Sequence, residues 1–191
     1  MHLGIDYGAK LAGTTAICFE KNKQLVLLQS EKKKDADKFV QQAVEQWQPN
    51  SIFIDAPLSL PLAYFGKGNN YFYRTADKVL QGMSPMFLGG LTARAIKLTK
   101  YFEKTGISCY ETYPAQIVKH YLADKTEGYK KQQTFLANFS YILETELPFT
   151  FLEAPTNWHQ VDSILAWWAG WRFYNGKVAT YGKEEEGLIY I

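Results

Sequence analysis

The sequence predicts an α/β protein with a five-stranded mixed sheet and helices on both faces. Three short apolar segments separated by turn residues, 3–7, 14–20 and 24–30, predict an opening antiparallel meander. Two further apolar segments, 51–55 and 107–112, are too short for helices, and each follows a segment with helical spacing of apolar residues. A helical crossover lets two strands run parallel, so we expect the fourth and fifth strands to be parallel to the first.

The remaining elements follow in order. Asp35 is placed to cap a helix whose apolar spacing ends before Pro49. Segment 61–90 is rich in glycine and aromatic residues and irregular, with one short helical stretch at 74–81, so we expect an insertion or lid there. Residues 90–104 have a broad apolar helical face.

The last third of the chain is predicted to be mainly helical. Pro114 is suited to the first turn of a helix after the fifth strand, and a longer helix is expected over 129–147. The final helix runs over 158–174 and is apolar on most sides. The tail, 178–191, is expected to form a closing turn and a short strand or edge contact. Together these elements predict one domain over 1–191.

Composition limits the classes of function. The 21 Lys and Arg residues nearly balance 19 Asp and Glu residues, so a basic surface could only be local, as at 32–34 or at the pair Lys130 and Lys131. Two cysteines far apart in apolar segments are typical of reduced core residues. The N-terminus lacks the features of a secretion signal, and the longest apolar run is too short to cross a bilayer. We expect a cytoplasmic protein without a membrane partner.

Acidic residues stand where the predicted strands end. Asp6 ends the first strand, Asp55 ends the fourth, Glu111 lies near the end of the fifth, and Asp162 falls in the first turns of the last helix. Sites in α/β sheets form at the carboxyl ends of parallel strands, so these acids are expected to converge. Clustered carboxylates repel one another unless a cation is bound, and oxygen ligands favour Mg²⁺ or Mn²⁺. Glycines around Asp6 are expected where backbone or a phosphate comes close.

Four segments carry a resemblance to a known family. They are Gly4-Ile5-Asp6-Tyr7-Gly8 followed by Gly13, Ile54-Asp55-Ala56-Pro57-Leu58-Ser59-Leu60-Pro61, Glu111-Thr112-Tyr113-Pro114-Ala115, and Asp162-Ser163 on the last predicted helix. Between the second and third, Arg74 and Asp77 form an Arg-x-x-Asp pattern. Together they resemble a family of predicted RNase H-like nucleases over nearly the whole chain, and are distantly similar to Holliday-junction resolvases.

The resemblance implies a fold and a metal site. It implies a single RNase H-like domain in which Asp6, Asp55 and Asp162 match the acids that hold two metal ions. His159 stands three residues before the final acid, where resolvases commonly have an acid or a histidine. The resolvases usually have glutamate at the fourth strand, so Asp55 is one methylene shorter than their residue.

The resemblance also implies a reaction, the hydrolysis of phosphodiester bonds in nucleic acid by a two-metal mechanism with Mg²⁺ or Mn²⁺. Glu111 joins the three aspartates as a candidate catalytic residue, or else forms a structural ion pair with Arg74 or Arg94. Arg74 is expected to hold a phosphate oxygen, with Asp77 orienting it. His159 is expected to ligate metal or move protons.

Two other classes of function stay open. The turn that begins at Asp6 and Gly8, with Gly13 after it, also resembles the first phosphate loop of the actin, sugar-kinase and chaperone ATPases. Those proteins need two lobes, so this chain would have to form a homodimer to bind a nucleotide in that way. The third possibility is a catalytically inactive module that binds nucleic acid or a partner. DNA, RNA and a small phosphate ester all remain candidate substrates.

Overall fold

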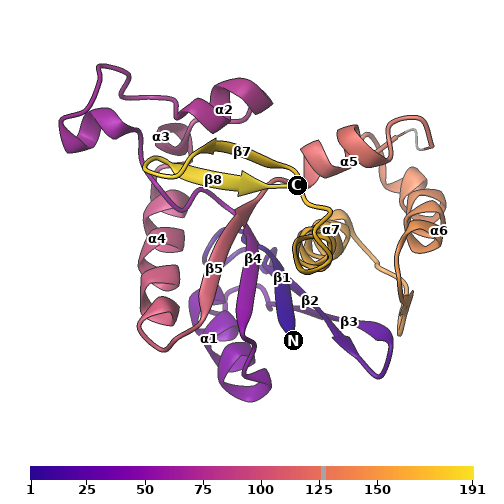
Figure 1. Cartoon of the computed structure of the whole chain (residues 1–191). Coiled ribbons are helices and arrows are strands. Elements are labelled where there is room, and N and C mark those ends of the chain that lie inside the picture. Colours follow the sequence, from indigo (N-terminus) through magenta and orange to yellow (C-terminus); the bar gives the residue numbers. More distant parts are fainter. Residues whose placement is uncertain (126–127) are drawn as a thin grey trace.

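The computed structural model describes residues 1–125 and 128–191, and the strands of this part form one mixed sheet (Figure 1). The five central strands of this sheet have the predicted directions. The strands β1 (His2–Asp6), β2 (Ala16–Lys21) and β3 (Gln24–Gln29) form the antiparallel meander. The strand β4 (Ser51–Asp55) is parallel to β1, and β5 (Ser108–Thr112) is parallel to β4.

The sheet is wider than predicted, because the described residues form eight strands in the order β6-β3-β2-β1-β4-β5-β8-β7. The strand β6 (Thr150–Phe151) pairs with β3, and a hairpin of β7 (Thr180–Lys183) and β8 (Gly187–Tyr190) extends the other edge through β5. The prediction of five strands is therefore wrong. A two-residue strand has no periodicity to detect, and the hairpin lies within the tail expected to give only a short strand or edge contact.

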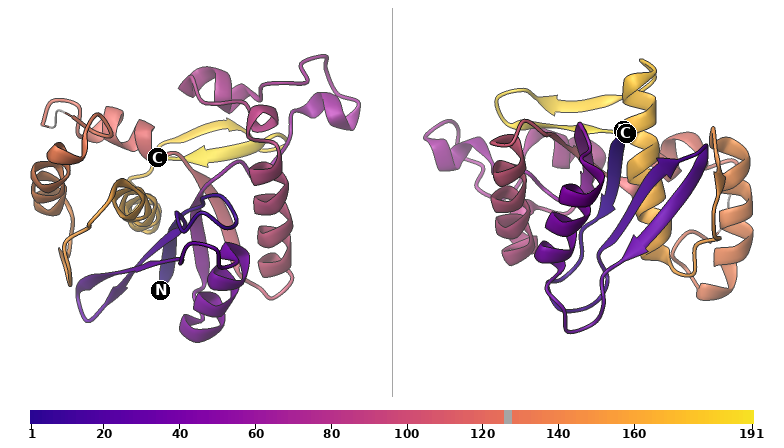
Figure 2. Two further views of the ribbon diagram at one scale, coloured as in Figure 1. Left: turned by 180° about the vertical axis from the view of Figure 1, so that it is seen from behind. Right: turned by 90° about the horizontal axis from the view of Figure 1, so that it is seen from below.

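Helices cover both faces of the sheet, as predicted (Figures 1 and 2). The helices α1 (Ala36–Trp47) and α4 (Gly90–Glu103) lie on one face. The helices α5 (Pro114–Tyr121), α6 (Leu136–Glu146) and α7 (Trp158–Tyr174) lie on the other. Each face therefore has its own apolar core.

Side-chain alternation decides which face carries the site. Leu3 and Ile5 of β1 pack into the core under α1 and α4. Successive side chains of a strand point to opposite faces, so Gly4 and Asp6 face α7. In β4, Phe53 packs into the α7 core by the same rule, and Asp55 follows it on that face. Both aspartates thus end their strands beneath α7.

One predicted helix is wrong in its first part. The segment 129–147 was expected to be one helix, but α6 begins at Leu136 and is preceded by turns and a 3-10 helix, η2 (Gln133–Phe135). Lys130 has a φ of 56° and Gly128 a φ of 86°, and this left-handed backbone is incompatible with an α-helix. The apolar spacing of the segment conceals that turn.

The predicted insertion at 61–90 contains three short helical segments, η1 (Leu62–Phe65), α2 (Thr75–Leu80) and α3 (Pro85–Leu88). It lies beside the β7–β8 hairpin, beyond the end of β4 (Figure 1). Glu186 of the hairpin binds the insertion: its carboxylate accepts from the backbone N–H groups of Leu62 (3.3 Å) and Thr75 (2.7 Å). The insertion is therefore fastened to the edge of the sheet.

Among the helices in the described ranges, none combines the length and apolar character needed to span a bilayer.

Candidate metal centre

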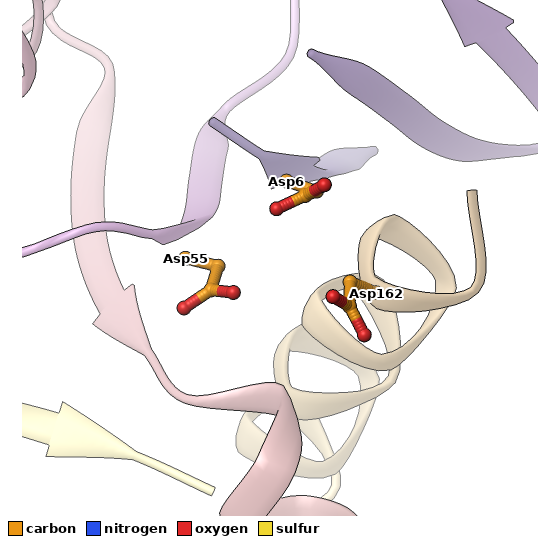
Figure 3. A group of neighbouring side chains, drawn as sticks. All are labelled: Asp6, Asp55 and Asp162. Carbon is orange, nitrogen blue, oxygen red and sulfur yellow. The ribbon is translucent and has the colours of Figure 1, made fainter. Parts of the chain in front are cut away.

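Three aspartates converge at one end of the sheet (Figure 3). Asp6 and Asp55 end the neighbouring parallel strands β1 and β4, where they are register partners, and Asp162 lies on α7. Each offers a carboxylate oxygen, and these oxygens all lie within 4.8 Å of one another. The structure thus brings together the three residues predicted to hold metal.

Two glycines let α7 lie directly on β1 and so bring Asp162 to Asp6. A Cβ on Gly4 would be 2.1 Å from the backbone nitrogen of Trp167 on α7. A Cβ on Gly170 would be 2.4 Å from the His2 ring, which also forms a 2.9 Å hydrogen bond from Nε2 to the Trp167 carbonyl oxygen. The close approach at Gly4 is therefore one of backbone to backbone.

The aspartates are held with little solvent around them. Asp6 is 8% exposed and Asp162 is 1% exposed. Burial, and next the charges of Asp6 and Asp162, raise the pKa of Asp55 well above its usual range. Burial also raises the pKa of Asp162 to about 6, although the Lys130 ammonium opposes it. Such a group of carboxylates would be stabilised by a cation.

The three aspartates differ in the hydrogen bonds that their carboxylates receive. Within the described ranges, the Asp55 carboxylate receives no hydrogen bond, which leaves its oxygens available as ligands. His159 lies on α7 three residues before Asp162, and its Nδ1 is 2.7 Å from an oxygen of Asp6. This hydrogen bond is the main cause that raises the pKa of His159. His159 therefore lies against a candidate metal ligand.

Two residues of the site were not predicted. The Tyr129 hydroxyl donates to one oxygen of Asp162, and the Lys130 ammonium forms an ion pair with the other. Lys130 was noted only as half of a basic pair, and both residues fall in the segment expected to be helical. Both residues stand in the turns before η2, where Lys130 has a left-handed backbone.

Glu111, Arg74 and Asp77 form a separate cluster beside the aspartates. Arg74 is 1% exposed, and its guanidinium donates to both oxygens of Asp77 (3.0 and 2.7 Å) and both of Glu111 (2.7 and 2.6 Å). It donates also to the Ser59 hydroxyl (2.8 Å), which accounts for all five N–H groups of a guanidinium. Glu111 further accepts from the backbone N–H of Leu58 (2.8 Å).

This cluster gives the ion pair between Glu111 and Arg74 that the sequence left open. In this arrangement Arg74 has no donor free for a phosphate, so its predicted contact with substrate is not supported by the geometry. Arg94, the other candidate partner of Glu111, instead pairs with Asp37 (2.6 Å). Asp77 does orient Arg74, as expected, and fixes it in a buried network.

The glycine turn after Asp6 is folded tightly on itself. A Cβ on Gly8 would lie 2.1 Å from the Thr14 hydroxyl oxygen. Gly13 has a φ of 73°, and a Cβ there would lie 2.7 Å from the backbone nitrogen of Lys32. Arg94 also donates to the carbonyl oxygen of Gly8 (3.1 Å). The glycines are required by packing within the turn, which favours a structural role over an open phosphate loop.

A cavity of about 240 Å³ adjoins the aspartates. Asp6 and Asp55 line one side of it, and the other lining residues come from the insertion, the start of α4, the ends of β1, β4 and β5, and β8. Comparison with family models gives no match to this chain, and no curated protein matches it significantly in sequence.

Proposed function

We propose that the protein is an RNase H-like nuclease that hydrolyses phosphodiester bonds of nucleic acid with Mg²⁺ or Mn²⁺. The observation that supports the proposal is the set of carboxylate oxygens of Asp6, Asp55 and Asp162, all within 4.8 Å of one another. They come from the first strand, the fourth strand and the last helix, the positions that the resemblance implies. An all-oxygen donor set with little solvent is suited to a hard divalent cation.

The three aspartates would hold two ions, which when bound supply an activated water and neutralise charge at the scissile phosphate. His159 keeps Nδ1 on Asp6, so its other ring nitrogen, Nε2, is the atom that would exchange protons with the leaving or attacking oxygen. No protein nucleophile is required. The half-exposed His159 ring gives that nitrogen access to solvent.

Lys130 takes the phosphate-binding role in this proposal. Its ammonium now neutralises Asp162, and its side chain is 47% exposed, so it can leave when a divalent ion binds the carboxylate. The displaced ammonium would then lie next to the site where a substrate phosphate binds. Arg74, with every donor used, stays in its buried network.

The test is cleavage of single-stranded, duplex, hybrid and branched substrates by the wild type and Asp6→Asn. The variant keeps the shape of the side chain and removes a charge that the metal needs, so we expect at least a hundredfold loss of cleavage with unchanged folding. Asp124→Asn, at an exposed position that is not among the three clustered aspartates, is the matched control and should cleave as the wild type does.

Two results would count against the proposal. Equal cleavage by the wild type and Asp6→Asn would indicate a contaminating nuclease. No cleavage by either protein, with Mn²⁺ bound to neither, would favour the inactive binding module.

A further inference from the structure

The cavity beside the aspartates is continuous with the candidate metal centre. Asp6 and Asp55 line it directly, so a phosphate held at the carboxylates would carry its attached group into this space. Its volume of about 240 Å³ is roughly that of eight water molecules in the liquid. There is room for one ring system.

The rest of the lining is mainly apolar. Pro57 follows β4, Met83 and Leu88 come from the insertion, Leu91 from α4, and Tyr113 precedes α5. Gly82 brings the backbone of the insertion against the Tyr113 ring, because a Cβ there would lie 3.3 Å from its Cε1. The insertion therefore holds the Tyr113 ring in place as part of the cavity wall, and a flat apolar group inside the cavity would pack against this wall.

The charged residues that also line the cavity are already paired. Arg74 uses its five N–H groups on Asp77, Glu111 and Ser59, and Glu111 also binds the backbone of Leu58. This wall therefore offers no free cation for a second phosphate. An uncharged flat group is therefore a better occupant of the apolar part of the lining than a second phosphate.

The same pairing makes the cavity preformed. The Arg74 cluster joins the insertion to β5, and Glu186 joins it to the hairpin, so the roof of the cavity is anchored at two places. A preformed cavity binds its ligand without the free-energy cost of ordering a loop.

From these observations we infer that the cavity receives one unstacked nucleobase, from the nucleotide whose phosphate lies at the aspartates. This inference rests on the proposed function and defines its substrate class. A base within a continuous duplex is stacked and paired, and it reaches such a cavity only after it is extruded. The enzyme therefore acts on single-stranded or unpaired nucleotides in preference to continuous duplex.

Calorimetry in Ca²⁺ with two probes tests the cavity without requiring turnover. Thymidine 5′-phosphate carries a base, and deoxyribose 5-phosphate does not. We expect the wild type to bind the first at least tenfold more tightly. Leu91→Trp and Met83→Trp fill the cavity and should abolish that preference. Phe87→Trp, at a 64% exposed position of α3 that does not line the cavity, is the matched control and should keep it.

The Mn²⁺ dissociation constant of each variant shows that the site is folded. Met83 is 60% exposed, so its substitution keeps the test available if Leu91→Trp fails to fold. Equal binding of the two probes by the wild type would overturn the inference, as would a preference that persists in Met83→Trp. Cleavage of continuous duplex as fast as single strand would also overturn it. If the wild type prefers the probe with a base but cleaves no substrate, the cavity binds a base and the proposed nuclease activity is wrong.

Discussion

Arg74 is a buried cation that forms ion pairs with two buried carboxylates, Asp77 and Glu111. Removing one member of such a group leaves the others without compensation, which costs about 3–5 kcal/mol. We therefore expect Arg74→Met, which keeps the length of the side chain, to lower the free energy of unfolding by about that amount in urea denaturation.

The matched control for Arg74 is Lys67→Met. Lys67 pairs with Glu185 at 3.0 Å, but both side chains are more than half exposed. An exposed pair contributes about 0–1 kcal/mol, so this variant should unfold almost as the wild type does. Equal losses in the two variants would mean that the buried network does not stabilise the fold.

His2 gives the fold a defined dependence on pH. Burial between Trp167 and the sheet lowers the pKa of His2 from 6.5 to about 4. The unfolded chain therefore takes up a proton at a higher pH than the folded protein does. The contribution of neutral His2 to stability is complete above pH 6.5 and is lost as the pH falls toward 4, a total of about 3 kcal/mol.

Measured against His2→Phe, this contribution can be separated from the titration of the aspartates, which both proteins share. The wild type should lose up to about 3 kcal/mol of stability relative to the variant between pH 7.5 and pH 4. A stability difference between the wild type and His2→Phe that stays constant over that range would contradict the prediction.

At the scale of secondary structure, the contact between β1 and α7 decides the geometry of the metal centre. Gly4→Ala would place a Cβ 2.1 Å from the backbone of Trp167, so α7 must move away from the sheet. We expect a loss of about 2 kcal/mol or more in unfolding free energy. We also expect at least tenfold weaker Mn²⁺ binding, because Asp162 moves with the helix.

Gly90→Ala serves as the control for that substitution. Gly90 begins α4, and a Cβ there meets no atom within 4 Å, so alanine should be neutral or slightly stabilising. If Gly4→Ala kept wild-type Mn²⁺ affinity, the position of α7 would not control the site.

The elements differ in how far the sequence could predict them. Apolar periodicity predicted α1, and short apolar segments predicted the central strands. Asp6 and Asp55 could be predicted as well, because the end of an apolar segment is visible in the local sequence. Tyr129 and Lys130 escaped prediction because their place depends on a left-handed turn that apolar spacing does not register. The two-residue β6 depends on pairing with a distant strand, for which no local signal exists.

For the whole molecule, metal binding should appear as thermal stability. A ligand that binds only the folded state at a hundred times its dissociation constant adds about 2.7 kcal/mol. In a protein of this size, each kcal/mol raises the midpoint temperature of thermal unfolding by about 2–4 °C. Saturating Mn²⁺ should therefore raise that midpoint by roughly 5–10 °C. Differential scanning calorimetry measures the shift.

Asp6→Asn distinguishes the site from general salt effects. Its midpoint should stay within about 1 °C when Mn²⁺ is added at the same ionic strength, because a ligand has been lost. A full shift in this variant would place the metal elsewhere on the molecule.

The fastening of the insertion by Glu186 has a consequence for the order of events during synthesis. The strands β1 to β5 and the helix α7 leave the ribosome before the β7–β8 hairpin does, so the three aspartates can meet first. The insertion gains its second anchor only when Glu186 emerges and binds Leu62 and Thr75. We therefore expect the insertion to be the last part of the fold to become fixed, after the strand ends that carry Asp6 and Asp55 have paired.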